Sequence, residues 1–459
     1  MEQTVSEQSA EISRLHRIIH QKDKRIQALE KENKKLREGL SVYEKPDKDS
    51  HNSSIAPSQE SINAKAVRRT SSLRQKSTLK SGGQPGHPGT TLATGSTPDF
   101  IEHHISEYCV HCGQRLNQAE AVLSGSCQVV DIPPVRPQVK EHRCYRRTCT
   151  CGHINNALLP DGCSKRISYG INIQTITGYL AHVQCIPFQR ICETLRDLFG
   201  LHLSEGTVKN ILARIGKKAD ALYRQIRERI QGSTVVGADE TGEFINGRLH
   251  WGWIFQTRTL TYAYQDKSRG MEAIDKHFPG GLPNTILVSD RHSSYFRMDV
   301  KDHQVCLAHL LRNAQYLDQP DSRQDWSKRF GTLLRDAIRL SKSKHPKEMA
   351  IQAVGNIKDR LDRLLEESLA HLHKDFQSLS KGIAKCRDYI FTFLKNPDVP
   401  HHNNDSERAI RKIKIKQKVS GRFRTEDGAD TFMKIHSVVE TPKKNGNSKF
   451  EAIRAVIQL

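Results

Sequence analysis

The sequence predicts a multidomain α+β protein, and three observations support this prediction. Heptad spacing over residues 10–41 indicates a long N-terminal helix. Most of the eleven cysteines lie from Cys109 to Cys163, in a segment with little apolar periodicity. From Ser233 onward, apolar runs typical of strands are followed by long stretches with helical spacing. At 459 residues, the chain is long enough for about three domains.

The charge of the chain restricts its partners. Lys and Arg number 72 against 51 Asp and Glu, which gives a formal net charge of +21. This balance favours binding to a polyphosphate such as nucleic acid, although a basic protein without such a partner is the alternative. No apolar run approaches the roughly 20 residues that span a bilayer, and the first residues lack the apolar core of a secretory signal. We therefore expect a cytoplasmic protein with no membrane partner.

Residues 1–44 are predicted to form a coiled-coil helix. Its a positions are Ile12, Ile19, Ile26, Asn33 and Leu40, and its d positions are Leu15, Lys22, Leu29 and Leu36. A single Asn at an a position can fix the register of a parallel dimer, so we expect a homo-oligomer. The alternative is one amphipathic helix that packs on its own chain.

Residues 45–99 are predicted to be a basic linker. They are rich in Gly, Ser and Pro and lack apolar periodicity, which indicates irregular structure. Their arginines and lysines could hold a DNA backbone, or the segment could be a solvated tether.

Residues 100–165 are predicted to be a small, zinc-ribbon-like region. Cys109 and Cys112 precede Gly113 in a CxxCG pattern, and Cys149 and Cys151 precede Gly152 in a CxCG pattern. Two such cysteine turns suit a tetrahedral structural Zn²⁺. The second spacing departs from the commoner CxxC, so other ligands and ordinary buried cysteines stay open as alternatives. The substitute ligands would be His111, Cys144, His153 and Cys163.

Residues 166–230 are predicted to be helical and to contain a helix-turn-helix. An amphipathic stretch over 187–199 ends at Gly200, and Ser204 is a favourable N-cap for the next helix. In a helix-turn-helix, the second helix lies in the major groove of DNA. We expect Lys209, Asn210 and Arg214 on its exposed face, with a helical hairpin that only packs as the alternative.

Residues 231–320 are predicted to begin an α+β domain with a defined strand order. An apolar run ends at Asp239, and Asn246-Gly247 is a strong hairpin signal. A third strand over 259–264, a helix over 271–278 and an apolar run ending at Asp290 follow. Three antiparallel strands, a helix and a strand that can pair in parallel form the order of the ribonuclease H-like fold, an analogy at the level of the fold.

Three carboxylates stand out as candidate metal ligands. Asp239 and Asp290 follow apolar runs, and Glu407 opens a strongly basic helix. Oxygen ligands of this kind suit Mg²⁺, which retains positions for phosphate and water. In the alternative reading, the aspartates start turns and Glu407 forms a capping box with Asn404. Glu240 and Asp405 are the nearest carboxylates that could be mistaken for ligands.

The chain resembles transposases of the IS66 family of bacterial insertion sequences. The resemblance covers nearly the whole chain in five ordered tracts, of which one alone would be weak. The matching segments are 239–242, 250–253, 289–295, 305–312 and 402–411 followed by 420–424.

The resemblance implies a DDE triad of Asp239, Asp290 and Glu407 that holds two Mg²⁺ (or Mn²⁺) ions. It implies cleavage and strand transfer on double-stranded DNA, both transposon ends and target. It further implies accessory proteins encoded by the element and a cytoplasmic, nucleoid-associated location. The competing readings are a ribonuclease H-like nuclease or resolvase without strand transfer, and an inactive DNA-binding regulator.

The remaining segments complete the predicted catalytic domain. Residues 321–398 read as an α-helical insertion, and residues 399–459 return to the catalytic domain with Glu407. Basic residues on the helix after Glu407 are predicted to clamp phosphates. Cys306 and His309 form a Cys-x-x-His pair, which is too few ligands for a metal site and suggests a structural role near the active site. The predicted DNA-contacting residues of this helix are Arg408, Arg411, Lys412, Lys414 and Lys418.

Overall fold

A computed structural model describes residues 2–41, 86, 97–116, 121–160, 163, 167–317, 325–343 and 347–459. The predicted linker over 45–99 lies outside the described residues, apart from Gly86 and residues 97–99. None of the helices in the described ranges combines the length and apolarity that a membrane crossing requires.

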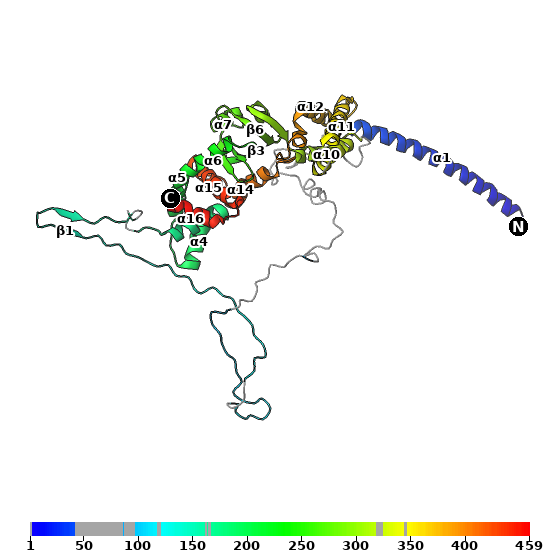
Figure 1. Ribbon diagram of the computed structural model, residues 1–459. Coiled ribbons are helices and arrows are strands. Elements are labelled where there is room, and N and C mark those ends of the chain that lie inside the picture. Colours follow the sequence, from blue (N-terminus) through cyan, green and yellow to red (C-terminus); the bar gives the residue numbers. More distant parts are fainter. Residues whose placement is uncertain are drawn as a thin grey trace.

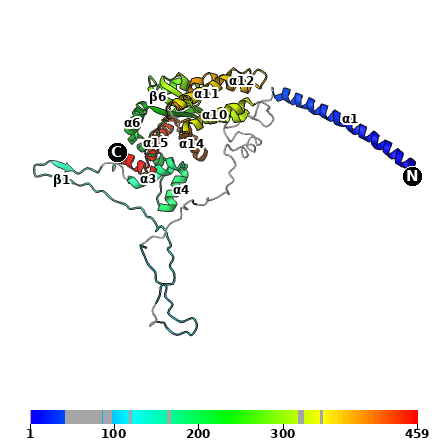
Figure 2. The same ribbon diagram turned by 45° about the vertical axis from the view of Figure 1, so that its right-hand side comes forward.

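The N-terminal helix α1 (Glu2–Ser41) is one continuous element that projects from the rest of the chain (Figures 1 and 2). Its heptad side chains face solvent, with exposed fractions between 42% and 64%. The predicted helix is therefore confirmed, and an unpaired apolar stripe runs along it. These side chains are Leu15, Ile19, Ile26, Leu29 and Leu36.

A largely extended segment, described over residues 97–116 and 121–160, carries the paired cysteines. Its strands β1 (Arg146–Thr148) and β2 (Ile154–Asn156) form a small antiparallel hairpin. All six strand residues are exposed, so this hairpin has no core of its own.

A helical region leads into the sheet. Gly200 caps the C-terminus of the helix over residues 188–199. Its backbone has φ 65°, in the left-handed region that glycine adopts without steric cost. The Ser204 side chain then accepts a hydrogen bond from the backbone N–H of Thr207 at 3.2 Å. Both predicted helix boundaries are confirmed. The elements are α3 (Ile171–Gly178), the π-helix η2 (Tyr179–Val183), α4 (Phe188–Phe199), α5 (Glu205–Lys218) and α6 (Asp220–Gln231).

A five-stranded mixed sheet forms the centre of the body, in the order β5-β4-β3-β6-β7. The first three strands along the chain are antiparallel neighbours, whereas β6 pairs in parallel with β3 and β7 in parallel with β6. Asn246 and Gly247 join the first two strands with φ 47° and 77°, as the hairpin prediction requires. The strands are β3 (Val235–Ile245), β4 (Arg248–Gln256), β5 (Thr261–Asp266), β6 (Leu282–Ser289) and β7 (Val300–Val305).

The sheet differs from the sequence-based expectation in two respects. Asp239 lies inside β3 instead of at its end, because the polar stretch after it continues in register with β4 as far as Ile245. A fifth strand, β7, was not predicted, because Val300–Val305 contains four polar residues in six. Two short helices connect these strands: α7 (Met271–Asp275), which is shorter than the predicted 271–278, and α8 (Ser293–Arg297).

Helices cover both faces of the sheet, because side chains alternate along each strand. Val236 and Ala238 join a core with α6, α7 and α15. Ile286 and Val288 join a second core with the helices that follow β7. These helices are α9 (Leu307–Leu317), α10 (Trp326–Lys342), α11 (Lys347–Glu366), α12 (Lys374–Ala384) and α13 (Thr392–Lys395), with a 3-10 turn η3 (Arg387–Tyr389).

Three C-terminal helices follow; the first two pack on the sheet, and the third packs on the second and on α3 and α5 (Figure 1). They are α14 (Asn404–Ser420), α15 (Glu426–Lys444) and α16 (Lys449–Gln458). Ile410 and Ile413 of α14 pack with Ile254 of β4 in a third apolar cluster. This packing brings the segment after residue 399 back onto the first strands, although more than 140 residues separate them in sequence.

Candidate acidic centre

Asp239 lies in β3, and Asp290 directly follows β6, the parallel neighbour of β3. Val235 pairs with Ile286 and Gly237 pairs with Val288, so the same register extended by two residues aligns Asp239 with Asp290. Because side chains alternate along strands, both carboxylates lie on the same face of the sheet. The structure thus brings together two aspartates separated by 51 positions.

The electrostatics of the two aspartates reflect their crowding. Burial raises the pKa of Asp239 well above its ordinary value, and the charges of Glu240, Asp290 and Glu407 raise it further. Burial and the charge of Glu240 raise the pKa of Asp290 to about 6. The backbone N–H of His292 has the opposite effect, because it donates a hydrogen bond to Oδ1 of Asp290 at 2.8 Å. Uncompensated negative charge of this kind favours a proton or a cation between the carboxylates.

The N-terminus of α14 is held against β3 by a buried hydrogen-bond network. Asn403 donates from Nδ2 to the Ala238 carbonyl at 2.6 Å, and the Ser406 hydroxyl donates to Asn403 Oδ1 at 2.6 Å. Gln256 of β4 donates to the same hydroxyl at 3.0 Å. A Cβ atom on Gly237 would lie 2.7 Å from the Ser406 oxygen, so only glycine allows this approach.

Glu407 projects from the first turns of α14 and is not a capping residue. Asn403 is the N-cap, without a side-chain capping bond, so Glu407 occupies the fourth helical position, and the capping box with Asn404, which was the alternative reading of Glu407, is absent. Its Oε1 accepts a hydrogen bond from Arg312 Nη2 at 2.7 Å and lies 3.6 Å from His309 Nε2. Its charge still raises the pKa of Asp239, after the larger influences of burial, Glu240 and Asp290.

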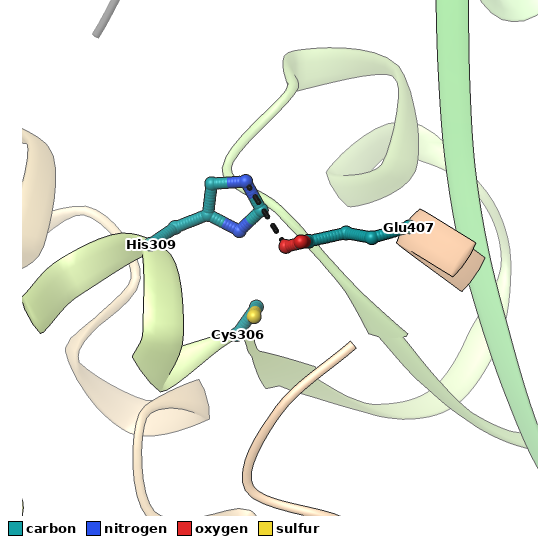
Figure 3. Close-up of side chains that lie close together, drawn as sticks. All are labelled: Cys306, His309 and Glu407. Carbon is teal, nitrogen blue, oxygen red and sulfur yellow. Dashed lines mark ion pairs between the residues drawn. The ribbon is translucent and has the colours of Figure 1, made fainter. Parts of the chain in front are cut away.

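Cys306 and His309 lie beside Glu407, as Figure 3 shows. One potential ligand atom from each residue lies within 4.8 Å of the other two. Burial and the charge of Arg312 lower the pKa of His309 to about 4, and burial raises the pKa of the Cys306 thiol. From the sequence alone, Cys306 and His309 were too few ligands for a metal site. The structure adds Glu407 as a third potential ligand.

Glu240 has a separate environment from its neighbour Asp239. Its side chain is 2% exposed and accepts hydrogen bonds from Arg269 Nη2 at 2.6 Å and from the Tyr295 hydroxyl at 2.5 Å. Arg269 in turn stacks on Trp251, 4.5 Å from the ring centroid. Both carboxylate oxygens of Glu240 therefore already accept hydrogen bonds from side chains, which distinguishes Glu240 from Asp239. Sequence reasoning missed Arg269, since no spacing pattern links it to Glu240.

Basic side chains border the acidic centre. The charge of Lys414 on α14 lowers the pKa of Asp239 and so opposes burial and the neighbouring carboxylates, which raise it. The charges of Arg269 and Arg291 likewise lower the pKa of Asp290. Arg312 pairs directly with Glu407. These four cations surround the acidic centre, and of them only Lys414 was among the predicted DNA-contacting residues.

The predicted basic residues of α14 fall into two groups. Arg411, Lys414 and Lys418 are exposed, as is Arg408, which pairs with Asp405. Lys412 instead donates from its ammonium to the Val183 carbonyl of η2. Lys412 therefore joins two parts of the fold and is not a free cation, because the helical region packs against this side of α14.

The predicted contact residues of α5 are all exposed. Lys209, Asn210 and Arg214 lie on the face opposite Val208 and Ile211, which are buried. The structure leaves this helix face available to a partner.

The cysteine turns are formed but remain apart. Gly113 donates to the Cys109 carbonyl at 2.8 Å, and Gly152 donates to the Cys149 carbonyl at 2.9 Å. Backbone N–H groups, chiefly those of Cys112 and Cys151, lower the pKa of Cys109 and of Cys149 respectively. Across the described residues, however, these thiols do not form a group with ligand atoms within 4.8 Å of one another.

The donor set fits divalent cations at the acidic centre. Buried carboxylates with raised pKa values provide hard oxygen ligands whose mutual repulsion a cation would relieve. Asp239, Asp290 and Glu407 do not form a group of three oxygens within 4.8 Å, because Glu407 faces Arg312 and His309. In this arrangement Arg312 would compete with a shared cation for Oε1 of Glu407.

An acidic centre on a mixed sheet, bordered by cations in a chain of net charge +21, is the arrangement of a protein that acts on nucleic acid. A family model described as "Transposase IS66 family" matches residues 167–431, more than half of the chain. The chain belongs to this family of transposases, as the sequence resemblance indicated.

The chain is also similar to an uncharacterized protein, y4jO, of Sinorhizobium fredii (strain NBRC 101917 / NGR234). The two are 29% identical over 176 residues, which cover 37% of this chain and 51% of y4jO. The aligned part thus spans about half the length of that relative.

Proposed function

We propose that this chain is a DDE transposase that cleaves DNA at transposon ends and joins the freed 3′ ends to target DNA. The observation that carries this proposal is the alignment of Asp239 with Asp290 on adjacent parallel strands, with Glu407 beside them on α14. The strand order β5-β4-β3-β6-β7, with two antiparallel and two parallel pairings, supports a ribonuclease H-like catalytic domain.

Asp239, Asp290 and Glu407 would hold two Mg²⁺ (or Mn²⁺) ions in this mechanism. When bound, such ions polarise the scissile phosphate and lower the pKa of a water nucleophile. The chain itself would orient the reacting groups: β3 and β6 fix the two aspartates, and α14, held on β3 by Asn403 and Ser406, carries Glu407. Lys414 and Arg291 would hold the non-bridging phosphate oxygens and neutralise their charge.

The surrounding parts suggest how DNA is engaged. The exposed face of α5 with Lys209, Asn210 and Arg214 would bind the element ends, as the second helix of a helix-turn-helix does. The exposed cations of α14 would track the backbone next to the cleavage site. Such a protein would act in the cytoplasm on the nucleoid, with or without accessory proteins of the element.

Two further features support assembly. The unpaired apolar stripe of α1 would be buried by a second copy in a parallel coiled coil. Cys109, Cys112, Cys149 and Cys151 would form one structural zinc site once their two turns approach each other, since each turn already directs backbone N–H groups at a thiol.

The triad is tested by charge-neutral substitutions in the full-length protein. Asp239→Asn, Asp290→Asn and Glu407→Gln should each reduce Mg²⁺-dependent cleavage of DNA carrying the element's ends by about 10³-fold or more, because a metal ligand contributes several kcal/mol to the transition state. Binding to the same DNA should change little. Asp405→Asn is the matched control, since Asp405 is exposed on the same helix turn. Cleavage at the wild-type rate by a triad variant would refute the assignment.

The products distinguish the competing functions. Joined molecules of an element end and a target plasmid indicate strand transfer. Cleavage without joined products would favour a nuclease or resolvase, and binding without cleavage would favour a DNA-binding regulator.

A further inference from the structure

Three residues of different chemical character meet at the edge of the acidic centre. Cys306 directly follows β7, His309 lies in the first turn of α9, and Glu407 belongs to α14 (Figure 3). One ligand atom of each lies within 4.8 Å of the other two. Of the described residues, this is the set in which three potential metal ligands converge so closely.

The donor types differ from those of a magnesium site. A thiolate, an imidazole nitrogen and a carboxylate oxygen suit a borderline-soft cation such as Zn²⁺, whereas Mg²⁺ prefers oxygen alone. With Zn–N and Zn–O bonds of about 2.0–2.1 Å, tetrahedral ligand atoms lie about 3.4 Å apart. The separation of 3.6 Å between His309 Nε2 and Glu407 Oε1 already approaches this value.

Neighbouring groups prepare the first two ligands. The backbone N–H of Asn403 donates to Cys306 Sγ at 3.1 Å, which fixes the sulfur and stabilises its anionic form. Nδ1 of His309 is buried without a hydrogen-bond partner, and Nε2 lies 3.6 Å from Oε1 of Glu407. The exposed fraction of the His309 side chain is 30%, so the site is open to ions from solvent.

Arg312 competes with a cation for this position. Its Nη2 donates to the Glu407 oxygen that also faces His309, at 2.7 Å. The guanidinium and a divalent ion therefore exclude each other at Oε1 of Glu407, and a bound ion must displace Arg312 from that oxygen.

We propose that Cys306, His309 and Glu407 form a binding site for a thiophilic divalent cation, with Zn²⁺ as the probe, which inhibits the chain by withholding Glu407 from the aspartate pair. Glu407 then has two positions: with Cys306 and His309 it is inactive, and with Asp239 and Asp290 it completes the catalytic centre. The inhibitory part rests on the proposed function, whereas the existence of the site does not.

Binding is measured first, by titrating full-length protein with Zn²⁺ against a chromophoric chelator. Cys306→Ser should lose one Zn²⁺ per chain, or weaken one site at least tenfold, since even indirect partners of a metal ligand contribute roughly 10–100-fold. Ser retains an acceptor for the Asn403 N–H, and His309→Gln serves as a second variant on a partly exposed side chain. Cys386→Ser is the matched control, because Cys386 is buried elsewhere in the same core and should leave zinc binding unchanged.

Arg312→Gln provides a test with the opposite sign. Removal of the competing guanidinium should tighten the same site several-fold, whereas loss of a merely structural ion pair would not raise zinc affinity. Unchanged zinc stoichiometry and affinity in Cys306→Ser and His309→Gln would overturn the site, because the cysteine turns at residues 109–151 would then account for all bound zinc.

Activity is measured second, as the Zn²⁺ concentration that halves Mg²⁺-dependent cleavage, relative to each variant's own uninhibited rate. His309→Gln should raise this concentration at least tenfold, and Arg312→Gln should lower it. Loss of zinc binding in the variants without any change in inhibition would refute the inhibitory role. Zinc binding at this site in a protein that cleaves no DNA with Mg²⁺ would refute the proposed function and leave the site intact.

Discussion

The acidic centre and the cysteine segment both collect potential metal ligands, but they do so in opposite ways. Ligands of the acidic centre come from β3, β6 and α14 and meet because a packed sheet and a buried hydrogen-bond network hold them. The cysteine turns form from neighbouring residues alone and lie on an exposed segment. The packed core keeps the mutually repelling carboxylates close together. Each cysteine turn, by contrast, positions only two of the four thiols of the predicted zinc site.

The largest effect is expected at the contact between α14 and β3. Gly237→Ala should lower the free energy of unfolding by about 1–3 kcal/mol, because its Cβ would lie 2.7 Å from the Ser406 oxygen and 2.8 Å from Asn403 Oδ1. DNA cleavage should fall further than stability, since the same shift displaces Glu407. Gly355→Ala in α11 is the control. Nothing lies within 4 Å of the added Cβ, so the free energy of unfolding should rise by about 0.5–1 kcal/mol. Chemical denaturation together with a cleavage assay measures both, and an active Gly237→Ala protein would show that the network does not place Glu407.

The pH dependence of stability should reveal the crowding of the aspartates. The folded pKa of Asp290 is about 6 and its ordinary value is 3.8. Between about pH 4 and 6 the metal-free folded state retains a proton that the unfolded state has lost, so its free energy of unfolding falls as pH rises, by on the order of 1–3 kcal/mol.

Melting curves of the wild type and of Asp290→Asn test this point. The difference in melting temperature between the two should grow through that pH window in favour of the variant. Mg²⁺ should stabilise the wild type more at pH 7.5 than at pH 5. Parallel curves at all pH values would mean that the aspartate pair is not crowded in solution.

A smaller effect is expected at the neighbouring carboxylate. Glu240→Gln should destabilise the protein by about 1–2 kcal/mol, because Arg269 and Tyr295 lose a charged acceptor. Cleavage should decrease far less than in Asp239→Asn, since Glu240 positions the arginine and does not reach the substrate. A loss of cleavage equal to that of Asp239→Asn, with binding retained, would move the ligand role to Glu240.

The smallest effect on stability is expected in the cysteine segment. Cys149→Ser should change the free energy of unfolding of the rest of the protein by less than about 0.5 kcal/mol, as is usual for exposed positions. Alkylation followed by mass spectrometry should modify Cys109 and Cys149 first, because their pKa values are lowered, and Cys386 last, because burial raises its pKa to about 11. Added Zn²⁺ should protect all four turn cysteines together. Protection of only one pair would show that the turns do not share an ion.

Part of this fold was accessible from sequence, wherever a few neighbouring residues decide the outcome. Asn246-Gly247 specified the hairpin, Gly200 ended α4, and Ser204 began α5, each through local backbone preferences. The order of the strands up to Asp290 followed from apolar runs of suitable length. The polar strand β7 carried no such signal, because its burial depends on the β6 edge that it joins.

The candidate site was accessible only as a list of residue types. Sequence spacing nominated Asp239, Asp290 and Glu407, but it treated the first as a strand end and the last as a possible cap. Only the pairing of β3 with β6 placed the aspartates on one face, and only the docking of α14 turned Glu407 toward Arg312 and His309.

The sequence by itself determined the boundaries at Gly200, Ser204 and Asn246-Gly247 and membership of a transposase family, because these depend on patterns within short stretches. The tertiary structure decided which charges meet: it separated Glu240 from Asp239, turned Lys412 inward, and joined the Cys306–His309 pair to Glu407. The physical reason is that contacts between distant residues depend on strand register and helix docking, which burial of the whole core selects.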